Sequence, residues 1–319
     1  MSPRQALHRL WDSLRGPEFD RALRRAELSG CHRFLFGWNR GLGDVGLGLT
    51  PFFERIRRAF GDSRIDVVTR ADLEPVFTLA GADSIRVVSG LKRGAALELE
   101  AEARRLGIDP RSYAGAFNNP DLRRWAHSAR QTVAPRLHWP AGFDGLSERF
   151  AELRDPGPWV GVHVRSETAQ FYRYVKDWPA ERWPRLFESV QAKIPARFVL
   201  LGIANDGELA RPGVVDLRGR TTLLEALCLV RTRLKVLVAP DSGVLSLVYL
   251  LDMEKDLDVV SLWADPRQGV LKLGQPSPNA RLRHHPLVGQ GEDIANISVQ
   301  EVSAAIVAAL ERKAEEAPR

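Results

Sequence analysis

The sequence has little cysteine, with only two in 319 residues. Cys31 and Cys228 lie far apart in the chain, and Cys228 lies between two leucines. This usage predicts neither a disulfide framework nor a cysteine-rich metal site. We expect two buried free thiols in a protein from a reducing compartment.

The chain also lacks the long apolar runs that mark targeting and membrane-spanning segments. No uninterrupted apolar stretch approaches the length of a bilayer span. Residues 1–25 are arginine-rich with a helical pattern, but they lack the continuous apolar core of a signal peptide. These features predict a cytoplasmic protein and leave open a peripheral contact with the inner membrane.

Positive charge is in excess without forming a block. Lys and Arg number 46 against 40 Asp and Glu, and the formal net charge is +6. The excess favours anionic partners, such as phosphorylated small molecules or a membrane surface. Zinc-finger spacing, a basic zipper and an aromatic RNA-binding signature are all missing from the sequence, so nucleic acid is not an expected partner.

What the chain does contain is two series of alternating strands and helices, the pattern of doubly wound α/β proteins. The predicted strands span residues 33–38, 64–69, 84–88, 159–164, 196–201, 234–238 and 258–262. The predicted helices span residues 50–60, 73–80, 97–106, 122–133, 179–192, 222–231 and 299–312. The strands are nearly all apolar, as expected for a parallel sheet covered by helices on both faces.

A region rich in proline and glycine separates the two series. The chain is long enough for two α/β domains, because domains of about 100–200 residues are common. We predict domains at residues 1–150 and 151–319, with the boundary in this region. Within the first domain, Thr50 as N-cap and Pro51 after it predict where the first amphipathic helix begins.

The segment 39–48, directly after the first predicted strand, is rich in glycine. Gly41 and Gly43 would let the backbone approach a ligand closely. A carboxylate in such a loop would repel a phosphate, which suggests that Asp44 faces a hydroxyl group and takes its proton. A capping or turn role for Asp44 is the alternative.

Two loops of the second half have the features of anion sites. Lys176 lies just ahead of a predicted helix, where its ammonium group and the free helix amides suit a diphosphate. Ser242 and Gly243 follow a predicted strand and begin another helix, while Asp241 could orient that loop. The pair of loops predicts a diphosphate-containing ligand in the second half of the chain.

The tryptophans and histidines of the second half are predicted to have structural roles rather than to bind a ligand. Trp178 and Trp183, at helical spacing, are predicted to pack in the core rather than stack on a base. His284 and His285 are adjacent, so they would point apart on a regular element, and the sequence indicates no carboxylate partner for them. We therefore predict a surface-exposed basic loop there and no metal site.

The order and spacing of these segments resemble glycosyltransferase family 9, the heptosyltransferases of lipopolysaccharide core assembly. The resemblance covers about residues 34–310. It is carried by Gly41-Leu42-Gly43-Asp44-Val45, Lys176, Trp178-Pro179, Glu181-Arg182-Trp183, Val199-Leu200-Leu201-Gly202, Val215-Asp216-Leu217, Gly219, Thr221 and Asp241-Ser242-Gly243.

The resemblance implies a GT-B architecture, in which two Rossmann-like domains face a central cleft. The N-terminal domain would hold a glycan or glycolipid acceptor, and the C-terminal domain would hold an ADP-linked heptose. The implied reaction is inverting and uses neither a metal nor another cofactor. Asp44 would be the general base for the acceptor hydroxyl, Lys176, Ser242 and Gly243 would hold the donor phosphates, and positive helix ends would stabilise the leaving nucleoside diphosphate.

Departures from the family pattern lie on the donor side. Ser246 stands where the family usually has a histidine, and Leu262-Trp263-Ala264-Asp265-Pro266 replaces a common Phe-Gly-Pro-Thr-Asp-Pro stretch. His163-Val164-Arg165 replaces His-Pro-Gly, so that Arg165 could add a phosphate contact and His163 could be structural or ligand-binding. Two alternatives stay open: a non-catalytic nucleotide-sugar-binding protein, and a transferase of the same fold with another donor.

Overall fold

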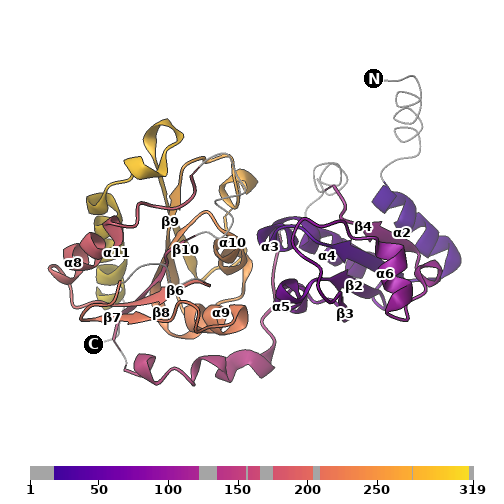
Figure 1. Ribbon diagram of the computed structural model, residues 1–319, viewed down its shortest axis with the longest axis horizontal. Coiled ribbons are helices and arrows are strands. Elements are labelled where there is room, and N and C mark those ends of the chain that lie inside the picture. Colours follow the sequence, from indigo (N-terminus) through magenta and orange to yellow (C-terminus); the bar gives the residue numbers. More distant parts are fainter. Residues whose placement is uncertain are drawn as a thin grey trace. The chain divides into compact units, whose positions relative to one another are not determined.

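The computed structural model describes residues 18–121, 135–155, 157–165, 175–203, 209–274 and 276–315. The chain divides into two compact units, Met1–His138 and Trp139–Arg319, called unit 1 and unit 2 below. Each unit contains one parallel sheet with helices (Figure 1), which confirms the predicted α/β class with two Rossmann-like halves. The division lies earlier in the chain than the boundary predicted at residue 150, because the segment Ala141–Ser147 packs against a helix of unit 2.

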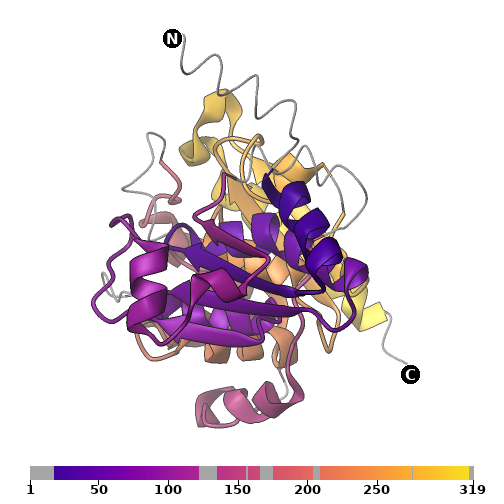
Figure 2. The ribbon, with the colours of Figure 1, turned by 90° about the vertical axis from the view of Figure 1, so that its right-hand side faces the viewer.

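Unit 1 contains a four-stranded parallel sheet in the order β3-β2-β1-β4. Its strands are β1 (Arg33–Trp38), β2 (Arg64–Thr69), β3 (Ser84–Val87) and β4 (Gly115–Asn118). Its longer helices are α2 (Glu18–Ser29), α4 (Thr50–Ala59), α5 (Glu74–Leu79) and α6 (Leu99–Arg105). The sequence predicts β1 and β2 with these bounds but misses β4, because glycine and asparagine are poor strand formers. Figure 2 looks onto this sheet, with α2 beside the edge strand β4.

The core of unit 1 lies on both faces of its sheet. On one face, the rings of Phe36 and Phe117 pack against phenylalanines of α4 and α2. On the other face, Leu35 belongs to the same buried cluster as Leu99 of α6. Because consecutive residues of β1 are buried on opposite faces, the strand is nearly all apolar, as expected for a sheet covered on both faces.

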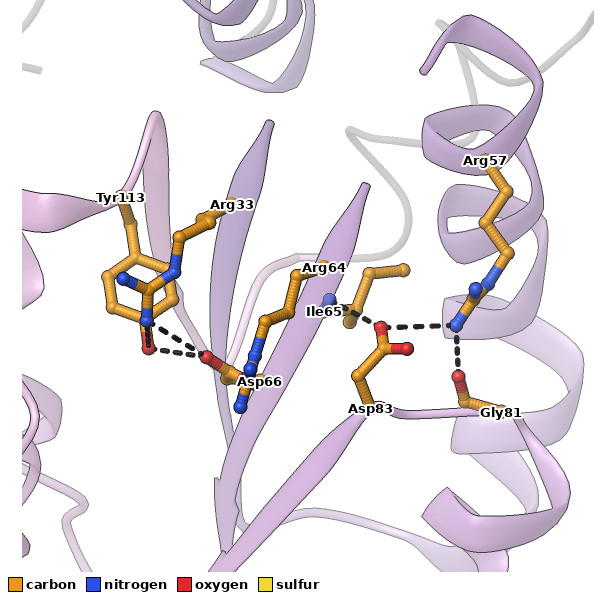
Figure 3. Close-up of polar contacts among 8 residues, drawn as sticks. All are labelled: Arg33, Arg57, Arg64, Ile65, Asp66, Gly81, Asp83 and Tyr113. Carbon is orange, nitrogen blue, oxygen red and sulfur yellow. Dashed lines mark hydrogen bonds and ion pairs between the residues drawn. The ribbon is translucent and has the colours of Figure 1, made fainter. Parts of the chain in front are cut away.

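A buried carboxylate connects neighbouring segments near the amino ends of these strands (Figure 3). Asp66 on β2 accepts a 2.5 Å hydrogen bond from the hydroxyl of Tyr113 and a 2.9 Å bond from Nε of Arg64. Nη2 of Arg33 on β1 lies 3.5 Å from the same carboxylate. Burial, together with the bond to Asp66, raises the pKa of Tyr113 to about 12.

We expect Tyr113→Phe to lower the free energy of unfolding by about 1–3 kcal/mol, because buried Asp66 would lose a hydrogen-bond donor. The folded-state pKa of Tyr113 lies above the ordinary value of 10.0, at about 12. The stabilisation is therefore fully present below pH 10 and is lost as the pH rises through 12. Denaturant unfolding of both proteins over this range measures the difference, and a difference that does not shrink would contradict the expectation.

Unit 2 contains a six-stranded parallel sheet in the order β10-β9-β8-β5-β6-β7. Its strands are β5 (Trp159–His163), β6 (Arg197–Leu201), β7 (Val214–Asp216), β8 (Leu234–Pro240), β9 (Leu257–Trp263) and β10 (Leu282–Val288). Its longer helices are α8 (Arg182–Gln191), α9 (Leu223–Thr232), α10 (Gly243–Leu250) and α11 (Val299–Glu315). Helices α8 and α11 cover one face of the sheet, and α9 and α10 cover the other (Figure 1). The strand order reverses at β5, and ligands of such sheets bind at the carboxyl ends of the strands beside this point.

Strand β10 corrects the prediction for the histidine pair. His284 and His285 lie in an edge strand that pairs in parallel with β9, and not in a surface loop. Nε2 of His284 lies 2.6 Å from Oγ of Ser261, and Nε2 of His285 lies 2.8 Å from Oδ1 of Asp258. His285 therefore does have a carboxylate partner, which the sequence hides because Asp258 is on the neighbouring strand.

The prediction of two buried free thiols is correct for only one of them. Both thiols are free, but only Cys228 is buried, whereas Cys31 is half-buried.

Within the described residues, no helix is long and apolar enough to cross a membrane. The same part of the chain has no group of three or more His, Cys, Asp or Glu side chains that could hold a metal ion. The predicted helix 122–133 lies outside the described residues, as does most of the arginine-rich segment 1–25.

Candidate functional site

The glycine-rich segment after β1 is helical, which corrects its prediction as a loop. Gly41 is the N-cap, followed by α3 (Leu42–Asp44), the π-helical turn Val45–Leu49 and α4. Thr50 is not an N-cap, because it lies inside this run and its hydroxyl donates a 2.6 Å bond to the carbonyl of Gly46. The glycines that predicted a loop instead lie in a wide turn, and π-helical turns of this kind are frequent at functional sites.

Asp44 lies in the first turn of this helix, next to Gly43, and is exposed to solvent. Its carboxylate turns back over the N-cap. A Cβ atom on Gly41 would stand 2.6 Å from Oδ2 of Asp44 and 3.9 Å from Nη2 of Arg93. The free amides of a first turn favour a negative charge. This position is compatible with both roles that the sequence left open, a base that faces an acceptor and an acid that stabilises the helix terminus.

In unit 2, two predicted donor-binding residues form a buried ion pair. Nζ of Lys176 lies 2.6 Å from Oδ2 of Asp241, and the side chains are only 9% and 7% exposed. Asp241 directly follows β8, and Lys176 lies in the connection from β5 to α8. Because β5 and β8 are neighbours in the sheet, the pair lies at the carboxyl edge beside the reversal of strand order. The sequence predicts that both residues serve one ligand but does not show that they contact each other.

Ser242 and Gly243 begin α10 beside this pair. Ser242 is the N-cap, and its Oγ accepts a 3.1 Å bond from the backbone N–H of Leu245. Ser246, which stands in place of the family histidine, is buried and donates its hydroxyl to the carbonyl of Ser242 at 3.1 Å. The hydroxyl oxygen of Ser242 is thus already a helix cap, so an anion would meet its proton and the first amides of α10.

Arg165 reaches the same edge from the end of β5. Its Nε lies 3.6 Å from Oδ2 of Asp177, which follows Lys176 in the chain. The Arg165 side chain is 54% exposed, so its guanidinium group lies largely in solvent. The structure therefore brings together at one edge the residues that the sequence predicts to bind a donor.

The segment that carries Lys176 is anchored by residues whose role the sequence does not reveal. Nε1 of Trp178 donates a 2.9 Å bond to the carbonyl of Ile297, and Nη1 of Arg182 donates bonds of 2.7 Å to the same carbonyl and 2.6 Å to that of Ala295. Trp178 and Trp183 are buried, and their rings meet edge to face with centroids 4.8 Å apart. This contact confirms their predicted packing role. A Trp-Pro pair after a lysine is the only sequence signal for this anchor.

Two more residues border the carboxyl edge. Gly269 has φ +48, and a Cβ atom there would stand 2.7 Å from Oδ1 of Asp241, so only glycine fits beside this carboxylate. His163, the last residue of β5, is 2% exposed, and its Nδ1 has no hydrogen-bond partner within the described segments. Burial lowers the pKa of His163 to about 4, which keeps the ring neutral at pH 7. This burial favours the structural role for His163.

Neither a family model nor a curated protein matches the chain. Several solved structures, however, are similar to the chain. Heptosyltransferase II of E. coli, an ADP-heptose lipopolysaccharide heptosyltransferase, is 17% identical over 88% of this chain and 99% of its own, with a TM-score of 0.64. A family 9 glycosyltransferase from Veillonella parvula is 16% identical over 88% and 98% of the two chains, with a TM-score of 0.62.

The E. coli heptosyltransferase WaaC, solved with ADP, is also similar. It is 15% identical over 87% of this chain and 99% of its own, with a TM-score of 0.55. At these identities the likeness establishes the fold, which is the two-unit GT-B fold of heptosyltransferases. The predicted fold of two Rossmann-like halves is thereby confirmed.

Proposed function

We propose that the protein is an inverting glycosyltransferase that moves a sugar, a heptose, from a nucleoside-diphosphate donor to the hydroxyl group of a glycan or glycolipid. The observation that carries the proposal is the gathering of Lys176, Asp241, Ser242 and Arg165 at one carboxyl edge of unit 2. That edge belongs to a fold shared with heptosyltransferases, one of them solved with ADP, which supports an ADP-linked donor.

The donor phosphates would meet positive groups from three elements. Lys176 has three N–H donors, so it can contact a phosphate oxygen while one of them stays on Asp241. Asp241 balances the charge of Lys176, and Asp177 lies 3.6 Å from Arg165, so the uncompensated positive potential at this edge comes from the N-terminus of α10. These groups would stabilise the departing nucleoside diphosphate, the task that a metal ion performs in other enzymes.

Asp44 would act on the acceptor. Its carboxylate takes the proton of the attacking hydroxyl, the oxygen bonds to the anomeric carbon, and the bond from that carbon to the phosphate oxygen breaks on the opposite side. One such displacement inverts the configuration. The exposed position of Asp44 in the first turn of its helix supports this role, because an acceptor hydroxyl can reach the carboxylate from solvent.

A second candidate is a non-catalytic nucleotide-sugar-binding protein. It is favoured by Ser246, whose buried hydroxyl is used on the carbonyl of Ser242 where the family has a histidine. A third is a transferase of the same fold with another donor. For each of them we place the protein in the cytoplasm, and a glycolipid acceptor would bring it to the inner membrane.

The test is a transfer assay with purified protein, ADP-heptose and lipopolysaccharide-core glycans in the presence of EDTA. We expect product formation that EDTA does not reduce, and NMR of the new linkage should show inverted anomeric configuration. A retained configuration would contradict the single displacement, and loss of activity in EDTA would contradict a metal-independent reaction. Donor binding without transfer or hydrolysis would favour the non-catalytic candidate.

A further inference from the structure

Asn39, the residue directly after β1, is a buried connection between strand ends. It is 2% exposed. Its backbone N–H donates a 2.7 Å bond to Oδ1 of Asn119, which follows β4. Its side-chain Nδ2 donates bonds of 2.9 and 2.8 Å to the carbonyls of Lys92 and Ala95, which follow β3. Asn39 therefore connects the end of β1 to the residue that follows β4 and to the segment that follows β3.

Arg70 adds the fourth strand to this connection. It directly follows β2, and its side chain is 6% exposed. Its Nη1 donates bonds of 2.9 Å to Oδ1 of Asn39 and 3.0 Å to the carbonyl of Arg40. Its Nε lies 2.6 Å from Oδ1 of Asp72, whose side chain is 66% exposed. All four strands of unit 1 thus meet at Asn39 through residues that follow them.

The connection ends at the helix that carries Asp44. The Arg40 carbonyl that accepts from Arg70 immediately precedes Gly41, the N-cap of that helix. The next carbonyl, that of Gly41, accepts a 3.3 Å bond from the indole of Trp38. The backbone just before Asp44 is therefore fixed by two side chains, one of them a buried guanidinium.

Stability alone does not explain a buried arginine at this place. Removing a guanidinium group from water is costly, and well-packed apolar residues often stabilise a protein as much as a buried ionic group does. Hydrogen bonds from a rigid, planar guanidinium group do, however, fix the positions of the acceptors that they reach. The contacts of Arg70 restrict one strand-to-helix turn, and Asp44 lies in the first turn of helix after it.

We propose that Asn39 and Arg70 are positioning residues for Asp44, because they hold the start of its helix against the segments that follow the other three strands. The inference rests on the proposed function of Asp44 as a base. A reacting group displaced by about 1 Å can lose about 10²-fold in rate. Loss of Arg70 should therefore slow the reaction without weakening donor binding, which belongs to unit 2.

The test compares Arg70→Gln with Arg70→Lys in the full chain by two measurements. The first is hydrogen–deuterium exchange of the backbone amides of residues 41–46, which requires no substrate. The second is the kcat and the donor KM of transfer. We expect Arg70→Gln to speed exchange at 41–46 and to lower kcat about 10–100-fold with an unchanged donor KM. Lysine, which keeps the charge but cannot reach every acceptor, should restore part of both properties.

Two control variants separate positioning from general stability. Asp72→Asn changes the exposed partner of Arg70 and leaves the bonds to Asn39 and Arg40 in place. Arg57→Gln removes another arginine of unit 1 that bonds a carbonyl, that of Gly81, beside Asp83 at the amino end of β3 (Figure 3). Both controls should match the native protein in kcat and in exchange at residues 41–46.

The outcomes distinguish this inference from the proposed function. Unchanged exchange at 41–46 in Arg70→Gln, or faster exchange over all of unit 1, would overturn the positioning role. Faster exchange confined to 41–46 in a chain whose native form transfers no sugar would support positioning and refute the base role. If Arg70→Gln does not fold, Arg70→Lys is subject to the same two criteria.

Discussion

Asp44→Asn lowers the rate of sugar transfer by about 10²–10⁴-fold, the range that general base catalysis contributes. The amide keeps the size of the side chain and a hydrogen-bond acceptor, but it cannot take a proton from the acceptor hydroxyl. Nucleotide-sugar binding should remain at the native level, because the predicted donor residues all belong to unit 2. Steady-state transfer assays, with donor binding measured separately, test both statements.

Gly41→Ala tests the position of this carboxylate. Alanine tolerates the φ of −67° and ψ of 145° at this residue, so the backbone is not strained. Its Cβ atom would stand 2.6 Å from Oδ2 of Asp44, so the carboxylate must move away. The moving group is the end of a flexible side chain, and we therefore expect slower transfer with little change in unfolding free energy.

Gly61→Ala is the matched control, because a Cβ atom there would meet nothing within 4 Å. It should transfer sugar at the native rate. Native rates in both Asp44→Asn and Gly41→Ala would rule out the base and leave Asp44 as an acid that only stabilises a helix terminus.

A second large effect is expected at the ion pair of Lys176 and Asp241. Lys176→Met removes the ammonium group that lies 2.6 Å from a carboxylate that is only 7% exposed. Breaking a buried pair from one side costs about 3–5 kcal/mol of unfolding free energy, because a desolvated charge remains. The same variant should lose nucleotide-sugar affinity, since a charged hydrogen bond to a phosphate disappears with the ammonium.

The double variant Lys176→Met/Asp241→Asn separates these two losses. With both charges removed, most of the unfolding free energy should return, whereas nucleotide-sugar affinity should stay low. Urea unfolding of the native, single-variant and double-variant proteins measures the first effect. Equal destabilisation in the single and double variants would show that the unpaired charge is not its cause.

Much of the fold follows from the sequence, and the misses have physical reasons. Apolar strands between amphipathic helices predict β1, β2, β5 and β8 closely. Strand β7 has only three residues, too short for a periodic signal. Strand β10 is an edge strand that contains polar residues and a proline, so its composition is not that of a buried strand.

Residues of the candidate site can be predicted from the sequence only where they follow a predicted strand, because ligands of parallel sheets bind at the carboxyl ends of the strands. Lys176 and Asp241 are both found in this way, but their contact joins segments far apart in the sequence. Glycines 46 and 48 predict a loop where packing and a π-helical turn produce a helix. Asn39 and Arg70 are overlooked because a single polar residue after a strand is typical of any loop. The only signal is that both directly follow a strand of the same sheet.

The most direct test of a donor site on unit 2 is the change in melting temperature on adding ADP-, GDP-, UDP- and TDP-sugars, because a ligand that binds the folded state stabilises it. We predict that one of them, with ADP-heptose the first to be tried, stabilises the native protein and Asp44→Asn alike. The shift should disappear in Lys176→Met/Asp241→Asn. No shift with any of these nucleotide sugars, or an equal shift in the double variant, would contradict a nucleotide-sugar site at this edge.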